Sequence, residues 1–328
     1  SVLVALGYAA LVVAFLEERG ALKRIDRLLV GAFVAGSIYP ITVIATANMG
    51  IIFGSLLGIG FIALERNRDS GGAVWALASL VNGFPALWGL YMLRVRRLRA
   101  VVAAIVTGLG ATVLGVIVFG IDAYLRFFST AASSRVRIDS FAGGASPDNE
   151  AVTPIRPLAQ LFPELDPHIW PPVIIIVVLL FSITIYYLLP TEELADRATL
   201  LLTTVIGITF MMPTSQDLDV YLVYVPLLVL LFFERHAVVH GLYALGTLFI
   251  SYNFGRAELR RVTELFGGDI SAAVMVVGEP VLAFASMPLY GLVVLYAGCL
   301  LKAWTRGSET GRLDTVRDRL GLEVDTSA

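Results

Sequence analysis

The stretch that most constrains this chain is Val101–Gly120, an apolar run without a single charged side chain. A run of roughly 20 apolar residues is long enough for a helix to cross the hydrocarbon of a bilayer. Inside hydrocarbon the backbone must satisfy its own hydrogen bonds, so a chain that crosses repeatedly folds into helices. Of the residues, 57% are hydrophobic and only 15% are charged, against about 25% charged in soluble proteins. The sequence therefore predicts an all-α, multi-pass protein of the cell membrane.

The apolar runs predict about eight or nine membrane helices. They are Ser1–Leu16, two crossings within Leu28–Leu64, Val101–Gly120, Pro171–Leu189, Ala198–Met212, Val220–Phe233, Val238–Phe254 and Leu282–Leu301. Lysine and arginine gather in cytoplasmic loops, which places Glu17–Arg27 and Arg94–Ala100 on that side. Residues 1–304 then form one membrane domain, and residues 305–328 form a cytoplasmic tail. The net charge of −2 gives no sign of a nucleic-acid partner.

The segment Ala73–Leu93 fits a simple crossing poorly. Basic residues precede it at Arg66 and Arg68, and four more arginines follow within Arg94–Arg99. A single crossing would leave one of these clusters outside, against the usual charge distribution. Its middle, Gly83-Phe84-Pro85, contains two helix breakers. The pattern favours a re-entrant hairpin with both ends cytoplasmic, and the alternative is an ordinary kinked span.

The polar interval Ile121–Trp170 lies between two apolar blocks and must stay outside the hydrocarbon. Loops of this length are usually functional or disordered. Its aromatic residues and closely spaced prolines favour an ordered cap over the membrane surface rather than a slack linker. Its arginines run against the usual charge distribution and indicate an anionic ligand or lipid headgroups; they are Arg126, Arg135, Arg137 and Arg156.

A second polar break, Pro213–Asp219, separates two apolar runs on the same outer side. Acids at a membrane boundary are candidates for function when they face the bundle interior. The alternative is that Asp217 or Asp219 caps the helix that follows. If that helix begins near Asp217, then Asp217, Tyr221 and Tyr224 share one face and Asp219 points away. The two acids could share a metal ion only if this strip were extended.

Several other features favour packing over chemistry. Gly54-x-x-x-Gly58, and Gly108 with Thr112, are small-residue faces of the kind that let membrane helices approach closely. Cys299 is the sole cysteine, so the chain has no disulfide framework and no cysteine-based metal site. Asn48 and Asn82 lie at helix interruptions, where an amide either caps broken backbone or binds a polar headgroup.

Several short patterns follow one another along the chain. They are the turn Ala47-Asn48-Met49-Gly50, the small-residue stretch Ala76–Pro85, Phe119-Gly120-Ile121-Asp122-Ala123-Tyr124, the loop portion Asn149–Thr153 and the break Pro213–Tyr221. In this order they resemble glycosyltransferase family 87, which belongs to the GT-C superfamily of integral membrane enzymes. The resemblance runs through most of the chain.

The resemblance implies a GT-C fold with a large outer loop. It implies transfer of a hexose, mannose above others, from a polyprenyl-phosphate donor on the extracytoplasmic face to a glycolipid, glycan or protein acceptor. No cofactor and no metal are expected. Catalysis is assigned to Asp219 and Asp217. The residues expected to bind substrate or the lipid phosphate are Asn48, Asn82, Tyr124, Arg126, Asn149, Arg156, Gln216 and Tyr221.

The chain also departs from the family pattern. Asn82 stands where the family has a lysine, and Gln216 stands where it has an aromatic residue. GT-C enzymes carry a catalytic-base aspartate in the first external loop, which residues 1–16 do not supply. We therefore expect residues 1–328 to bind the lipid carrier without turning over.

The alternative class is a polytopic transporter, or a scaffold that binds a lipid carrier without catalysis. A transporter typically shows two related halves and polar residues near the middle of the membrane. The chain shows no such repeat, and its polar groups gather at the outer boundary. This distribution favours an enzyme that works at the membrane surface.

Overall fold

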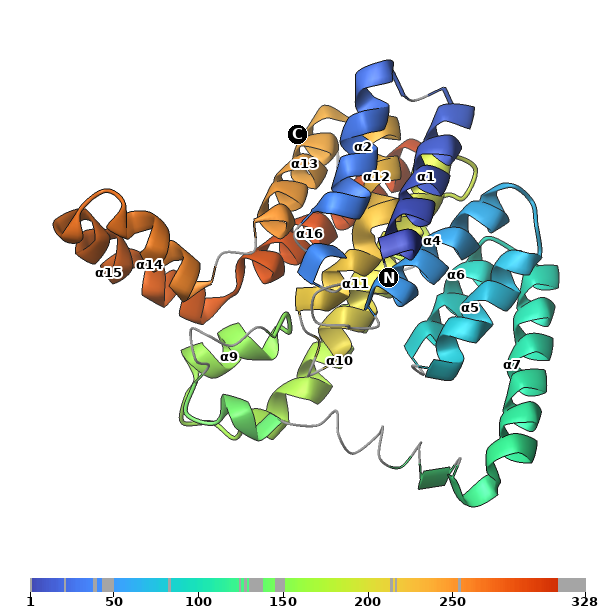
Figure 1. Ribbon diagram of the computed structural model, residues 1–328, viewed down its shortest axis with the longest axis horizontal. Coiled ribbons are helices and arrows are strands. Elements are labelled where there is room, and N and C mark those ends of the chain that lie inside the picture. Colours follow the sequence, from blue (N-terminus) through green and yellow to red (C-terminus); the bar gives the residue numbers. More distant parts are fainter. Residues whose placement is uncertain are drawn as a thin grey trace, which may run out of the picture.

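The computed structural model describes residues 2–20, 22–37, 40–42, 50–81, 84–123, 125–126, 129, 138–144, 151–212, 215, 217–252 and 255–311. Within these ranges the regular structure is helical and no strand occurs (Figure 1). The expected all-α fold of a polytopic membrane protein is confirmed.

The helices of the bundle alternate in direction. In chain order they are α1 (Val2–Glu18), α2 (Arg24–Gly36), α4 (Gly50–Glu65), α5 (Ser70–Val81), α6 (Gly89–Arg94), α7 (Leu98–Phe119), α10 (Trp170–Leu188), α11 (Leu194–Met211), α12 (Tyr224–Phe233), α13 (Ala237–Ser251) and α16 (Met287–Glu309). Outside the bundle lie α9 (Ile155–Leu161), α14 (Arg256–Glu264) and α15 (Gly268–Phe284). Short 3-10 helices complete the set: η1 (Phe84–Trp88), η2 (Ile138–Phe141), η3 (Pro167–Ile169) and η4 (Asp217–Val223).

Among the described residues, four helices are long and apolar enough to cross a membrane: Leu98–Phe119, Pro167–Leu188, Leu194–Met211 and Met287–Glu309. The other apolar helices are shorter, and include α4, α12 and α13. Helix α11 is the centre of the bundle, with 83% of its apolar window buried against α10, α12 and α16. Helix α7 is the opposite case, because none of its window is buried and it lies at one edge (Figure 1).

The predicted cytoplasmic turns meet at one end of the bundle. Ion pairs and hydrogen bonds join them: Glu18 with Arg66, Glu65 with Arg197, Lys302 with Glu234, and Arg94 with the carbonyl oxygens of Tyr186 and Leu189. The predicted outer segments meet at the other end, where the Val152 N–H donates to the Ser215 carbonyl over 2.9 Å. The grouping of loops inferred from the basic clusters is therefore confirmed.

The hairpin expected over Ala73–Leu93 is also confirmed. The Trp75 ring on α5 lies 5.7 Å from the Trp88 ring and 5.7 Å from the Tyr91 ring on the returning arm. In one continuous helix residues 75 and 91 would stand about 24 Å apart, at roughly 1.5 Å per residue. The chain thus enters and leaves this segment at the same end.

The expected span Leu282–Leu301 is wrong at its beginning. Helix α15 ends at Phe284, and α16 begins at Met287 after a break at Ala285 and Ser286. Pro288 lies in the first turn of α16, where a helix tolerates its missing N–H, so it favours a new helix start after the break. The preceding outer segment forms α14 and α15, which project from the bundle as a pair (Figure 1).

The small-residue face at Gly54 and Gly58 packs closely, as expected. Gly54 lies under the ring of Tyr221, and Gly58 lies under Tyr8, so that a Cβ at either glycine would overlap the tyrosine. The rings of Tyr8 and Tyr221 meet edge to face at 6.0 Å. These glycines bring α1, α4 and η4 together, which positions the outer break of the chain.

We expect the two ends of the bundle to lie on opposite sides of the membrane. Single cysteines at Ser140 and Ser308, both exposed, are introduced separately in a Cys299→Ala background. An impermeant thiol reagent should label them from opposite faces of sealed vesicles. Labelling of both from one face would contradict this topology.

We expect Gly54→Ala to destabilise the bundle, since the new methyl group must displace Tyr221. Overpacking of this kind typically costs about 1–3 kcal/mol. The control is Gly7→Ala on α1, where a Cβ meets no atom within 4 Å. Thermal unfolding in detergent, followed by tryptophan fluorescence, should show a lower midpoint for Gly54→Ala alone. Equal midpoints would mean that the Tyr221 ring yields without cost.

Candidate active site at the outer end of the bundle

The end of the polar interval folds down onto the bundle as a cover. Val152, Thr153 and Ile155 are buried, and the Val152 N–H donates to Ser215 in the second outer break. The Thr153 hydroxyl accepts from the Ile155 N–H over 3.4 Å, which supports the first turn of α9. Within the predicted cap, residues 138–144 and 151–170 fold into short helices and turns, whereas residues 124, 127–128, 130–137 and 145–150 lie outside the described residues.

Arg156 fastens this cover to α15. Its side chain is buried, its Nε donates to the Ala283 carbonyl over 3.1 Å, and a terminal nitrogen donates to the Leu282 carbonyl. Both carbonyls belong to the last turn of α15, where carbonyls lack partners within the helix and a cation is favoured. The guanidinium thus has a structural task, and its binding of a lipid phosphate stays a prediction.

The second outer break leads from α11 into η4, which begins at Asp217. In a 3-10 helix successive residues are about 120° apart, so positions 217 and 219 occupy different faces of η4. Tyr221 and Tyr224 are three residues apart and share a face, with ring centroids at 4.8 Å. The side chains of Asp217 and Asp219 lie outside the described part of the structure. The structure thus places the backbone of both acids and their catalytic role stays a prediction.

Tyr221 points into the bundle. Its hydroxyl donates to the Val34 carbonyl on α2 over 3.2 Å, and its side chain is 1% exposed. Tyr224 pairs with Ser37 at 2.8 Å and stacks on Phe33. These contacts hold η4 and the first residue of α12 against α2, just below the break.

Tyr8 is a polar residue at this level that the sequence did not indicate. It is 3% exposed, and its hydroxyl has no hydrogen-bond partner among the described residues. The Ser55 hydroxyl on α4 is likewise buried and without a partner in that part of the chain. A tyrosine or a serine in an apolar run resembles ordinary core, so only the packing of α1 on α4 reveals these groups.

The outer surface carries a small polar cluster around His168. Its Nδ1 lies 2.8 Å from Asp166, and its Nε2 lies 3.5 Å from Asp139 on η2. The pKa of Asp166 is lowered, chiefly because the backbone N–H of His168 donates to its carboxylate and then because the ring does so too. All three side chains are exposed, and they join η2 to η3.

The remaining predicted site residues are only partly placed. Arg126 is exposed and follows α7, which lies at the opposite edge of the molecule from α9 (Figure 1). The others lie outside the described residues: Asn48, Asn82, Tyr124, Asn149 and Gln216. In the described part of the chain, no three His, Cys, Asp or Glu side chains come together to hold a metal ion.

A comparison with protein families decides the class of this chain. The model of glycosyltransferase family 87 matches residues 1–213. The chain belongs to glycosyltransferase family 87. It is therefore a membrane glycosyltransferase, which uses a sugar donor and an acceptor. No curated protein and no solved structure gives a match. The match ends where the second outer break begins, so Asp217 and Asp219 of this glycosyltransferase lie beyond it.

We expect Arg156→Met to loosen the cover, because two carbonyls at the end of α15 lose their donors. Loss of hydrogen bonds from a charged group typically costs about 1.5–3 kcal/mol. Hydrogen exchange of residues 151–161 and of α15 should rise together, and Arg126→Gln, at an exposed position, is the control. Unchanged hydrogen exchange in Arg156→Met would contradict the structural role of this guanidinium. Ligand binding would then be the role left for it.

Proposed function

We propose that this glycosyltransferase transfers a hexose, mannose in the first instance, from a polyprenyl-phosphate donor to an acceptor on the extracytoplasmic face. The supporting observation is that the cover and the second outer break meet at one end of the bundle, through Val152 and Ser215. The chain of a lipid donor stays in the bilayer, so its phosphate and sugar lie at the membrane boundary. We propose that the outer break and the cover meet at this level.

The proposed reaction is an inverting displacement. The acceptor hydroxyl forms a bond to the anomeric carbon, the bond from that carbon to the phosphate oxygen breaks, and the phosphate leaves with the electron pair. A carboxylate takes the proton of the hydroxyl, a contribution of roughly 10²–10⁴-fold to the rate. We assign this task to Asp219, with Asp217 as the second candidate. The alternative base is the aspartate that GT-C enzymes carry in the first external loop, and its presence in this protein stays a prediction.

The departing phosphate needs cations or hydrogen-bond donors on the same side. We propose Arg126 as the cation, with Arg156 as the alternative, since the fold does not bring the two together. The polar groups proposed to contact sugar, acceptor or phosphate are Asn48, Asn82, Tyr124, Asn149 and Gln216. Tyr221, also expected from the sequence, is buried and donates to the Val34 carbonyl, so we assign it to support of the break. The acceptor would be a glycolipid, a glycan or a protein, and the proposed reaction uses no metal or other cofactor. The proposed location is the cell membrane, which the chain crosses several times.

The two acids of the break should not be equivalent. In a version of the protein with measurable transfer, reconstituted in liposomes with polyprenyl-phosphate mannose and an acceptor, one of Asp219→Asn and Asp217→Asn should lose most of its activity, roughly 10²-fold or more. The reason is that residues two apart in a 3-10 helix occupy different faces of it. Release of free polyprenyl phosphate is the measured quantity, and Asp269→Asn, an exposed acid on α15, is the control. Near-wild-type rates in both variants would contradict a catalytic role for these acids and favour the alternative that they cap the following helix.

A further inference from the structure

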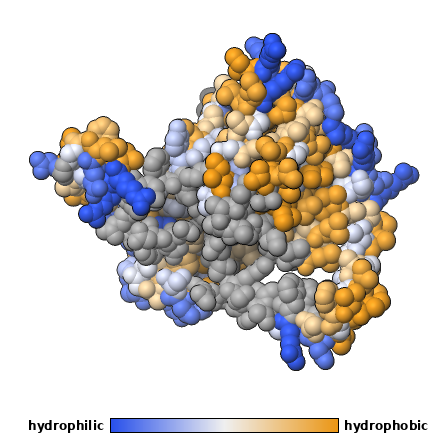
Figure 2. All heavy atoms as spheres, in the orientation of Figure 1, coloured by the Kyte–Doolittle hydropathy of each residue, from blue (hydrophilic) through white to orange (hydrophobic). Residues whose placement is uncertain are grey.

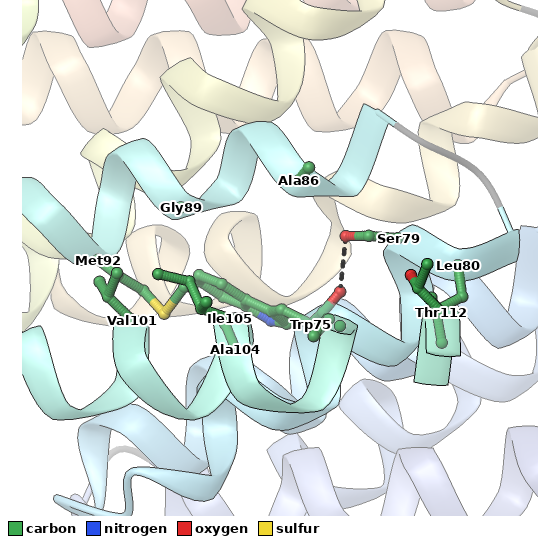
Figure 3. Close-up of a pocket in the computed structure, with 12 residues that line it drawn as sticks. Trp75, Ser79, Leu80, Ala86, Gly89, Met92, Val101, Ala104, Ile105 and Thr112 are labelled. Atoms are coloured by element: carbon green, nitrogen blue, oxygen red, sulfur yellow. Dashed lines mark hydrogen bonds between the residues drawn. The ribbon is translucent and has the colours of Figure 1, made fainter. Parts of the chain in front are cut away.

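A groove runs between the hairpin and α7. It has a volume of about 400 Å³, and Figure 3 shows Ala86 and Gly89 on one side of it with Ala104 and Ile105 across from them. Trp75 closes its floor, and the Trp75 indole is already engaged because its N–H donates to the Leu57 carbonyl over 3.0 Å. We call this feature the hairpin groove. Its walls are mostly apolar, with Ser79 and Thr112 as the polar residues in the lining.

Small residues keep the hairpin groove open. A Cβ added at Gly89 or Gly108 would meet no atom within 4 Å, whereas one at Gly54 would overlap a ring. The small-residue face at Gly108 and Thr112 was expected to receive a neighbouring helix, and it lines the groove instead. Protein interiors leave few voids of this size. A groove in the membrane wall of a helical protein fills with hydrocarbon.

The chain beside one mouth of the groove is strongly basic. Met92 and Val101 line the groove on either side of the turn between α6 and α7. Arg96 and Arg97 lie in this turn, and Arg99 lies in the first turn of α7. Within the described ranges none of these three guanidinium groups contacts a carboxylate. Other arginines at this end, such as Arg66 and Arg197, are paired. Figure 2 shows hydrophilic residues along the rim above the hydrophobic surface of this side.

The length of the groove matches one leaflet. From Val101 to Thr112 it follows α7 for about 16 Å, at roughly 1.5 Å per residue. Half of a hydrocarbon core of about 30 Å is about 15 Å. An acyl chain whose headgroup lies at the arginine turn therefore reaches the end of the groove near Thr112.

We propose that the hairpin groove binds an anionic phospholipid, with one acyl chain against Trp75, Gly89 and Gly108 and the headgroup phosphate at Arg96, Arg97 and Arg99. Basic pockets between membrane helices on the positively charged side recognise anionic headgroups in this way. The lipid completes the packing of α7, which otherwise contacts the protein along one side. The site lies in the leaflet opposite the one where sugar transfer is proposed. Lipid binding there is separate from the proposed reaction.

The test is lipid retention. The protein is transferred into nanodiscs that contain equal amounts of phosphatidylglycerol and phosphatidylcholine, then released for native mass spectrometry. The wild-type protein should retain more phosphatidylglycerol than phosphatidylcholine. Gly108→Leu, which fills the groove, should lose the bound lipid, and Ala104→Leu provides a second, smaller obstruction. Removal of the cations in Arg96→Gln/Arg97→Gln/Arg99→Gln should lower the preference for phosphatidylglycerol by roughly ten-fold or more.

Two matched controls separate the site from general effects. Gly110→Leu adds the same side chain to the exposed face of α7. Lys23→Gln/Arg24→Gln/Arg235→Gln removes the same charge from exposed positions at the same end. Both should behave as the wild type does. The proposal would be overturned if the wild type retained the two lipids equally or if Gly108→Leu retained phosphatidylglycerol. It would also be overturned if polyprenyl phosphate, added as a competitor, displaced phosphatidylglycerol. None of these results bears on sugar transfer at the outer end.

Discussion

The interaction on which the structure depends is a buried ionic network at the basic end of the bundle. The side chain of Asp196 on α11 has no exposed area and lies between Lys302 and Arg306 of α16, at 3.3 and 3.2 Å. Lys302 also contacts Glu234 at the end of α12 over 2.6 Å. Burial alone would raise the pKa of Glu234, and the Lys302 ammonium brings it below its usual value. Removing one partner of such a network costs about 3–5 kcal/mol, because the other charge is left buried.

The network fixes how α11, α12 and α16 slide and rotate relative to one another. A buried carboxylate accepts only the register that brings its cations within reach, which gives specificity even where the net stability gained is small. The Glu65–Arg197 pair adds α4 to the same end. Once these helices are held there, the opposite ends of α4 and α11 come to lie beside η4. The outer break is thus positioned by charges at the far end of the bundle.

The sequence predicted the direction of the helices and the hairpin, because basic clusters and a Gly–Pro break act locally. It could not predict that Arg156 would meet the Ala283 carbonyl, a partner 127 residues away in the chain. Sequence spacing also could not distinguish the small-residue face at Gly54 and Gly58 from the one at Gly108 and Thr112. Gly54 receives the ring of Tyr221, while Gly108 faces a groove, and the difference lies in which side chain the fold brings opposite. Tyr8 escaped notice for the same reason, since burial of its hydroxyl depends on α4.

The hairpin of α5, η1 and α6 has a consequence for the ancestry of the fold. Since the chain enters and leaves it at the same end, residues 70–94 do not change the direction of any later helix. A segment of this kind can be gained, lost or exchanged between relatives while the outer surface keeps its sidedness. An ordinary transmembrane helix lacks this property, because its loss inverts everything that follows. Variation in the hairpin is therefore a route by which this side of the bundle can diverge while the order and direction of the other helices are kept.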